Sequence, residues 1–243
     1  DCSSSLAQAW RRPGGRRAAG AQALKLDRSQ AVGYYRTKKK VGIMLKKEAR
    51  KITGGLSKPS KMPGPAYNLP AWHCQTGAKL RKIEGTPCFG CYAMKGRYRF
   101  SNVRAALERR LQAIESPLWV DAMVTLIKGQ PWFRWHDSGD IQSQKHLQNI
   151  FEVCKQTPET RHWLPTQERQ YLPEDPATVP DNLIIRLSGS KVDGPAPKAW
   201  PWTSSVVTSP EARTCPAPTQ SNECKDCRAC WDRSTGDVAY GKH

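Results

Sequence analysis

The chain has 243 residues, of which 38% are hydrophobic, and its 39 Lys and Arg outnumber its 21 Asp and Glu by 18 charges. The hydrophobic fraction lies below the ~45–50% of ordinary globular domains, so we expect a core that is small for the length. No apolar run reaches the ~18 residues that a membrane-spanning helix needs. The chain also opens without a signal-peptide pattern, which favours a cytoplasmic protein.

The positive charge is concentrated in the first half of the sequence. Residues 1–110 carry 25 basic and 5 acidic side chains, whereas residues 111–243 carry 14 and 16. So basic a half indicates a polyanionic partner, and we expect DNA or RNA rather than a membrane. The sequence leaves the oligomeric state open.

Residues 1–56 are basic, contain glycine and show little apolar periodicity. This composition is typical of a flexible tail or of sequence that is foreign to the folded protein. Such a tail can at the same time bind phosphates without reading sequence. From about Ser57 the chain becomes rich in proline, cysteine and aromatic residues. We therefore predict a core over residues 57–243.

The apolar periodicity predicts an α/β core. A helix is expected from Ser101, its N-cap, to about residue 114, a second opens at Pro117, and a third spans about 143–155. Strands are expected at 131–135, 162–164, 183–187 and 205–207. Strands alternating with helices favour a mostly parallel sheet of four to six strands. We predict a partial or degenerate (β/α) barrel, with an open sheet as the alternative.

Polar residues follow three of these strands, and functional groups gather at such strand ends in parallel α/β folds. Two carboxylates beside an imidazole can divide acid and base roles, or can hold a divalent metal. Asp140 or Ser143 can instead cap the following helix. The catalytic candidates are Asp137, which is preferred, and Asp140, His136 and Glu168; the cofactor-binding candidates are Ser188 and Ser190.

Four cysteines near the C-terminus are spaced C-x8-C-x2-C-x2-C: Cys215, Cys224, Cys227 and Cys230. Structural zinc usually uses two C-x2-C pairs that are well separated in sequence. Three cysteines at x2 spacing resemble the ligands of a cubane cluster. We expect a [4Fe–4S] cluster here, with Zn²⁺ as the alternative.

A second group comprises Cys74, Cys88 and Cys91. Three thiolates suit a cluster with one iron open to substrate. A zinc site completed by His73, or cysteines packed in a loop, are equally weighted alternatives. Cys154 lies on the apolar face of a predicted helix and is expected in the core.

Cations alternate with aromatic rings directly after the second cysteine group. Cations can contact phosphates while rings stack on bases, although a solvated surface has the same composition. In so basic a half we expect nucleic-acid binding by Lys95, Arg97, Tyr98, Arg99 and Arg104.

Several motifs together are similar to the actinobacteriophage "gene product eighty-eight" family over about residues 57–232. The resemblance implies a phage or mobile-element protein, and it supplies no activity. The motifs include Tyr67-Asn68-Leu69-Pro70-Ala71, Cys88-x-x-Cys91-Tyr92-Ala93, Phe133-Arg134-Trp135-His136-Asp137-Ser138-Gly139-Asp140, His162-Trp163-Leu164-Pro165-Thr166, Arg186-Leu187-Ser188 and Cys224-x-x-Cys227-Arg228-Ala229-Cys230-Trp231.

Two weaker resemblances suggest a reaction. The Cys88–Cys91 loop is similar to the cluster loop of radical S-adenosylmethionine enzymes, although thirteen residues separate Cys74 and Cys88 here; S-adenosylmethionine is thus a candidate cofactor. The Asp137-Ser138-Gly139 segment is similar to that of tRNA-guanine and 7-deazaguanine transglycosylases, which continue with Gly where this chain has Asp140.

We therefore expect a metallocluster enzyme that modifies bases in nucleic acid by radical or transglycosylase-type chemistry. One alternative is a non-enzymatic nucleic-acid-binding module whose loops are held together by an iron–sulfur cluster or zinc. The other is a nuclease with Mg²⁺ on Asp137 and Asp140. The enzyme hypothesis predicts that Asp137 shares a pocket with Cys88 and Cys91, with the segment 95–99 at its mouth.

Overall fold

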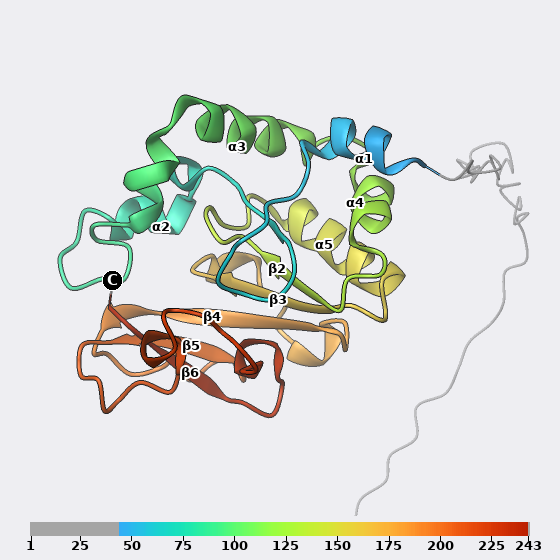
Figure 1. Cartoon of the computed structure of the whole chain (residues 1–243). Helices are drawn as coiled ribbons and strands as arrows, with labels where there is room; N and C mark the ends of the chain where they lie inside the picture. The colour runs from blue at the N-terminus through green and yellow to red at the C-terminus, as the bar shows by residue number, and fades with distance from the viewer. Residues whose placement is uncertain (1–43, 243) are drawn as a thin grey trace, which may run out of the picture. The chain divides into compact units, whose positions relative to one another are not determined.

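Within the part of the chain that the structure describes, six strands form one sheet (Figure 1). The structure is a computed structural model that describes residues 44–242. All adjacent strands are parallel and each pairs with the next one along the chain. The strands are β1 (Ala66–Tyr67), β2 (Trp132–Trp135), β3 (Arg161–Thr166), β4 (Leu183–Val192), β5 (Thr203–Val207) and β6 (Asp237–Gly241).

The predicted α/β class with a parallel sheet is confirmed. The sheet runs from β1 to β6 without closing, so a barrel is not shown. The edge strands β1 and β6 are absent from the sequence-based prediction. β1 has only two residues, and β6 follows the C-terminal cysteines, where turn-forming residues dominate the sequence.

Five α-helices accompany the sheet: α1 (Lys46–Thr53), α2 (Gln75–Leu80), α3 (Ser101–Ala113), α4 (Trp119–Ile127) and α5 (Gln144–Gln156). Figure 1 shows α3, α4 and α5 together on one side of the strands. None of the helices over residues 44–242 is long and apolar enough to cross a membrane. The short 3-10 helices are η2 (Ala71–His73), η3 (Tyr92–Met94), η4 (Gly96–Arg99), η5 (Arg169–Tyr171), η6 (Pro176–Thr178), η7 (Ala217–Thr219) and η8 (Ala229–Trp231).

The three predicted helices correspond to α3, α4 and α5, but one cap differs. Ser143 precedes α5, and its hydroxyl accepts a hydrogen bond from the His146 N–H at 3.1 Å. This is the ordinary N-cap contact, so Ser143 rather than Asp140 caps α5. Ser101 is the first residue of α3, and Phe100 occupies the cap position without a side-chain bond.

α1 lies inside the predicted tail. Its Ala49 is fully buried beside Ala122 and Leu126 of α4, and this contact joins α1 to the folded unit. Residues 44–56 are therefore structured. The rest of the predicted tail, residues 1–43, lies outside the described residues.

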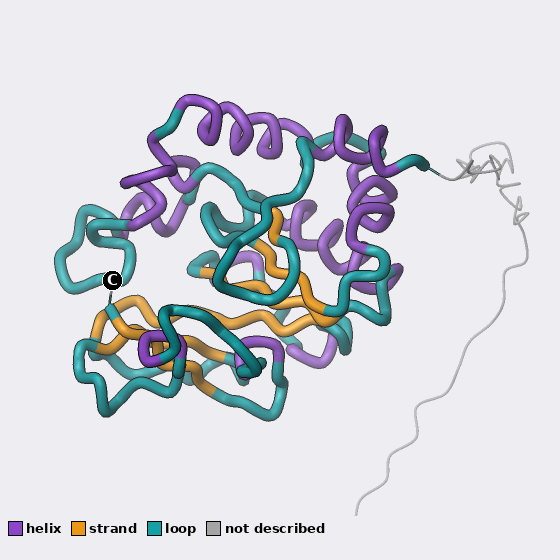
Figure 2. The backbone as a smooth tube through the Cα atoms, viewed as in Figure 1, coloured by secondary structure: helices purple, strands orange, loops and turns teal. Residues whose placement is uncertain are grey.

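Successive residues of a strand point to opposite faces of the sheet. Different parts of the chain cover these two faces. Phe133 and Trp135 of β2 are fully buried in the main core, which also holds Met123 of α4 and Ile150 of α5. On the other face, Trp231 packs edge-on against Trp132 and Trp163, with ring centroids 5.6 and 5.1 Å away. Trp231 is the last residue of η8, in the segment between β5 and β6. This segment consists mostly of loops (Figure 2). The segment that carries the C-terminal cysteines thus covers this second face.

Candidate functional site

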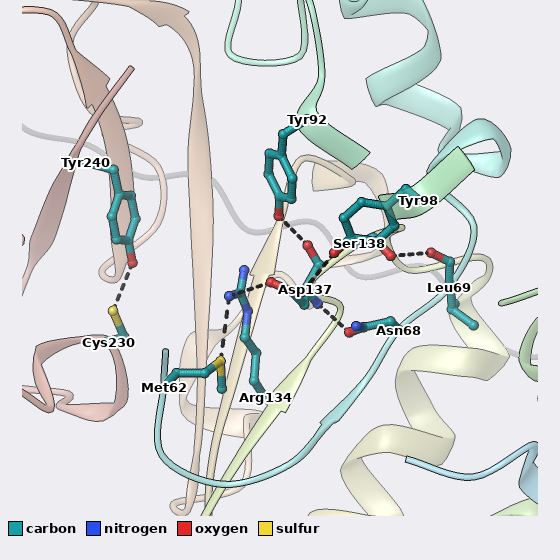
Figure 3. A network of polar contacts seen from close by, with 10 residues as sticks. All are labelled: Met62, Asn68, Leu69, Tyr92, Tyr98, Arg134, Asp137, Ser138, Cys230 and Tyr240. Atoms are coloured by element: carbon teal, nitrogen blue, oxygen red, sulfur yellow. Dashed lines mark hydrogen bonds and ion pairs between the residues drawn. The ribbon is translucent and has the colours of Figure 1, made fainter. Parts of the chain in front are cut away.

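Asp137 lies just beyond the end of β2, and neighbouring groups hold its side chain in place (Figure 3). Its Oδ1 forms an ion pair with Arg134 Nη1 at 2.9 Å, and its Oδ2 accepts a hydrogen bond from the Tyr98 hydroxyl at 2.9 Å. The Asp137 N–H donates to Asn68 Oδ1 at 2.8 Å. The Arg134 guanidinium also lies over the Trp163 ring, 4.4 Å from its centroid. Both carboxylate oxygens therefore have fixed partners.

The turn after Asp137 is locked to the segment that follows β1. The Ser138 hydroxyl donates to the Leu69 carbonyl, and the Leu69 N–H donates to the Ser138 carbonyl, both at 2.9 Å. Gly139 has φ +79°, and a Cβ atom there would lie 2.6 Å from Leu69 Cβ. Only glycine fits both the left-handed backbone and this close approach.

Two tyrosines connect Asp137 with the cysteine loop. The Tyr92 hydroxyl donates to the Asp137 carbonyl, and the Tyr92 and Tyr98 rings meet edge-to-face at 6.0 Å. Tyr92 directly follows Cys91, so Asp137 and Cys91 lie at the same edge of the sheet. A hollow of about 360 Å³ opens here, lined by Gly90, Tyr92, Lys95, Gly96, Arg97 and Tyr98. The structure thus places the predicted carboxylate, cysteine loop and basic segment in one region. The lining of the hollow includes neither Asp137 nor Cys88 nor Cys91, so the predicted shared pocket is not shown.

The thiols of Cys74 and Cys88 lie close to each other around Gly77 of α2. A methyl group at Gly77 would lie 3.6 Å from the Cys88 sulfur and 3.7 Å from the Cys74 sulfur. Burial, together with the nearby Cys91, raises the pKa of Cys88 to about 12. Burial also raises the pKa of Cys74, as do the charges of Asp140, Cys88 and Cys91. The three cysteines thus form one group of neighbouring, partly buried thiols.

The donor chemistry of this group fits a soft metal, and the absent side chain at Gly77 leaves space beside two of the sulfurs. The described residues do not form a finished site, however. Over residues 44–242, no group of three or more His, Cys, Asp or Glu side chains is arranged so that it could hold a metal ion. Metal binding therefore stays a prediction.

Glu168 is fully buried, which differs from the solvated side chain that is usual for glutamate. Its Oε1 accepts from the N–H groups of Gln75 and Thr76 at 2.9 and 2.8 Å, and its Oε2 accepts from the Thr76 hydroxyl at 2.6 Å. These donors form the first turn of α2, which directly follows Cys74. Glu168 therefore positions the cysteine loop, and its catalytic role stays untested.

Asp140 is buried and serves as a tie between the loop after β2 and the end of β3. Its Oδ1 accepts from the Thr166 hydroxyl at 2.6 Å and from the Ile141 N–H at 2.8 Å, and its Oδ2 accepts from the Gln167 N–H at 2.8 Å. Burial raises the pKa of Asp140 to about 7, against the lowering effect of these hydrogen bonds. Because its oxygens are occupied, Asp140 has little capacity left for a ligand.

The His136 ring lies in the protein core. Its exposed fraction is 3%, and its centroid lies 5.3 Å from that of His146 on α5. Neither ring nitrogen hydrogen-bonds to Asp137 or Asp140, and burial lowers the pKa of His136 well below its ordinary value. The predicted constellation of His136, Asp137 and Asp140 is therefore not assembled as one group.

Ser188 and Ser190 belong to β4 rather than to a loop after it, because β4 continues to Val192. The Ser188 hydroxyl lies 3.1 Å from the Ser204 hydroxyl of β5, and Ser190 is exposed. The structure places neither serine beside Asp137, and their predicted cofactor role stays untested.

Three features hold the C-terminal cysteines between β5 and β6. The Cys215 N–H donates to the Ala239 carbonyl of β6 at 3.1 Å, and the Cys230 sulfur lies 2.9 Å from the Tyr240 hydroxyl (Figure 3). The Cys224 N–H donates to the Lys61 carbonyl at 2.9 Å. Burial raises the pKa values of Cys215 and Cys224, and their neighbouring thiols, including that of Cys227, raise them further. The group is thus gathered in space as well as in sequence.

Burial raises the pKa of Cys230 to about 11, while the hydrogen bond with Tyr240 and the charges of Arg186 and Arg134 act against it. Arg134 thus lies within electrostatic range of the C-terminal cysteines while it pairs directly with Asp137. Sequence reasoning missed Arg134 and Tyr92 as site residues. The available signals were a cation inside an aromatic strand and a tyrosine adjoining a cysteine.

Arg186 of β4 is also a residue that sequence reasoning left without a role. Its side chain is fully buried and donates hydrogen bonds to six backbone carbonyls, of which four belong to the segment 229–235. The other two are the carbonyls of Thr203 and Gly236. One buried guanidinium therefore organises the turn that carries Cys230.

Of the predicted nucleic-acid-binding residues, Lys95, Arg97 and Arg99 are exposed, and Tyr98 is partly buried beside Asp137. Arg104 is exposed as well, and its guanidinium lies over the Trp72 ring, 4.4 Å from the centroid.

The model of the gene product 88 family matches residues 36–233. The chain belongs to this family. The gene product 88 assignment confirms the resemblance seen in the motifs and supports a phage protein. No curated protein and no solved structure matches the chain, so the two weaker enzyme resemblances have no support from these comparisons.

Proposed function

We propose that this gene product 88 protein is a thiolate metal protein, with iron–sulfur preferred over zinc, that binds nucleic acid and modifies its bases. The observation that carries this proposal is the common location of three groups. Cys91, Asp137 and the cations Lys95 and Arg97 are connected through Tyr92 and Tyr98 at one edge of the sheet. A purely structural metal needs neither a carboxylate nor a basic hollow beside it.

Cys74, Cys88 and Cys91 would hold the centre beside the hollow, and the cysteines at 215–230 would hold a second one. When bound, an iron–sulfur centre supplies redox or Lewis-acid chemistry and a zinc ion supplies Lewis-acid chemistry only. S-adenosylmethionine remains a candidate co-substrate on the resemblance of the Cys88–Cys91 loop alone, because the spacing between Cys74 and Cys88 departs from that family's pattern. A partial barrel is a further part of this proposal, since six parallel strands in sequential order resemble part of one.

Asp137 is the residue through which the proposed site acts. Its carboxylate accepts from Tyr98 and pairs with Arg134, and its backbone carbonyl accepts from Tyr92. It can therefore fix both tyrosines against a bound base, and an exchange of partners would free one oxygen for substrate. The Mg²⁺-nuclease alternative is less favoured because Asp140 already accepts three hydrogen bonds.

A non-enzymatic module is the second candidate. Arg186 and Glu168 use buried charges only to hold the two cysteine segments in place, which suits metals that staple loops. In that case the hollow and the surrounding cations bind nucleic acid without changing it.

One experiment separates these functions. The full chain, purified without oxygen, is incubated with DNA or RNA in the presence or absence of S-adenosylmethionine, and the digested nucleosides are analysed by mass spectrometry. We expect a new nucleoside mass that disappears with Asp137→Asn while binding persists. Binding with an intact metal and no new mass supports the module, and no binding at low salt contradicts both.

A further inference from the structure

Exposed aromatic rings are concentrated in the chain segment that lines the hollow. Among the residues that the structure describes, six large apolar side chains are exposed, and three of these are aromatic. They are Phe89, Tyr92 and Phe100, with exposed fractions of 47%, 45% and 58%. Single exposed apolar residues are ordinary, but three exposed aromatic residues within twelve positions of the sequence are a concentration that calls for a partner.

These rings project from a backbone that is held firmly. The Phe89 N–H donates to the Thr86 carbonyl at 3.2 Å, and the Phe100 N–H donates to the Arg97 carbonyl at 3.2 Å. Between them, η3 and η4 contact each other, and the Tyr92 hydroxyl bonds to the loop after β2. The aromatic surface is thus presented in a fixed arrangement, which lowers the entropic cost of binding.

Cations alternate with the rings over the same segment. Of the six described residues that line the hollow, Lys95 and Arg97 are basic and none is acidic. Phe89 directly precedes the lining residue Gly90 in the sequence. Phe100 follows the lining residue Tyr98, with the exposed Arg99 between them. The basic residues that line the hollow are therefore flanked in the sequence by an exposed phenylalanine on each side.

We propose that this surface, Phe89 to Phe100, binds single-stranded nucleic acid, with unpaired bases on Phe89 and Phe100 and a phosphate between Lys95 and Arg97. The inference rests on the proposed function and specifies its substrate class. Rings that stand in solvent can stack on a base only when the base is not already stacked inside a duplex. The cations alone would bind either form, so the exposed rings favour the single strand.

The test uses the full chain and fluorescent oligonucleotides of one sequence, either single-stranded or annealed to the complement. Phe89→Ala and Phe100→Ala should each weaken binding of the single strand about 5- to 150-fold and leave duplex binding unchanged. Leu118→Ala is the matched control, because Leu118 is 49% exposed but lies at the start of α4. Circular dichroism and the melting temperature of each variant should match the wild type, since these side chains lie at the surface.

Three outcomes separate this inference from the proposed function. Selective loss of single-strand binding in both phenylalanine variants supports the inference. Salt-sensitive binding that is equal for the two forms, or that ignores both substitutions, overturns it and leaves the proposed function standing. Failure of the wild type to bind either form contradicts both the inference and the proposed function.

Discussion

A substitution at Gly77 tests whether metal binding by the first cysteine group needs the free space beside the sulfurs of Cys74 and Cys88. The variant Gly77→Ala places a methyl group 3.6 Å from the Cys88 sulfur and 3.0 Å from Cys74 Cβ. Alanine favours a helix by about 1 kcal/mol over glycine, so α2 should stay folded. We expect the variant to bind less metal while it keeps the circular dichroism spectrum of the folded wild type, as measured by metal analysis and circular dichroism.

Gly236→Ala is the control for this substitution, because nothing lies within 4 Å of its added methyl group. It should retain the metal content of the wild type. If Gly77→Ala retains full metal content as well, the space between Cys74 and Cys88 has no role in ligation.

His162 makes the stability of the fold depend on pH. Burial lowers its pKa to about 3, below the ordinary value near 6.5. The unfolded chain therefore binds this proton first, and the stability that the neutral ring provides is lost as the pH falls from about 6.5 toward 3. In His162→Gln, the free energy of unfolding should fall less steeply over this range, by up to about 1.4 kcal/mol per pH unit.

Urea unfolding of both proteins between pH 7 and 4 checks this difference. Asp140, whose pKa burial raises to about 7, gives the opposite dependence, but it is present in both proteins and cancels in the comparison. Equal slopes for the two proteins would mean that His162 titrates normally in the folded state.

Residue types at strand ends are predictable, but their orientations are not. The sequence identifies both Asp137 and Asp140 as candidates after an aromatic strand and favours Asp137. Only the fold shows that Asp137 meets Arg134 and Tyr98, while Asp140 turns to Thr166. Tyr98 and Thr166 come from distant segments of the chain, so no local pattern could reveal these contacts.

At the scale of elements, helical periodicity is the reliable signal. α3, α4 and α5 are predictable because each repeats apolar residues on one face. β1 and β6 are too short or too polar to carry the alternation of a strand, and their place depends on pairing with β2 and β5. For β4, the Ser188-Gly189-Ser190 sequence suggests a loop, although the strand continues through it.

The segment between β5 and β6 should depend on Arg186. Replacing this residue in Arg186→Met removes the guanidinium hydrogen bonds to six carbonyls, among them those of Ala229 and Asp232. Loss of a buried charged partner typically costs about 3–5 kcal/mol, and we expect a decrease of this size in the free energy of unfolding, measured in urea.

Arg161→Met removes an exposed guanidinium at the start of β3 and is the matched control. It should change the unfolding free energy by less than about 0.5 kcal/mol. Similar stability of Arg186→Met and Arg161→Met would show that the C-terminal segment does not rely on the buried arginine.

At the scale of the whole molecule, a large part of the positive charge lies in the first 41 residues, which carry 10 basic and 2 acidic side chains. Because α1 packs on α4, a deletion should end before it, at residue 41. The shortened chain should stay folded and bind nucleic acid more weakly, with a shallower dependence of log affinity on log salt. Fluorescence titrations at several salt concentrations measure this slope, and an unchanged slope would show that these charges do not contact the nucleic acid.

The two cysteine groups are the central claim, and their metal content is the most direct test of it. The measurement is the visible absorption spectrum of the full chain purified without oxygen, together with quantitative iron, sulfide and zinc analysis. We predict broad absorption near 400 nm with about four iron and four sulfide per occupied cluster, and loss of the signal in Cys88→Ser and Cys227→Ser combined. Two results would contradict the account: wild-type protein that is folded but contains no iron or zinc, or a Cys88→Ser and Cys227→Ser double variant that melts at the same temperature as the wild type.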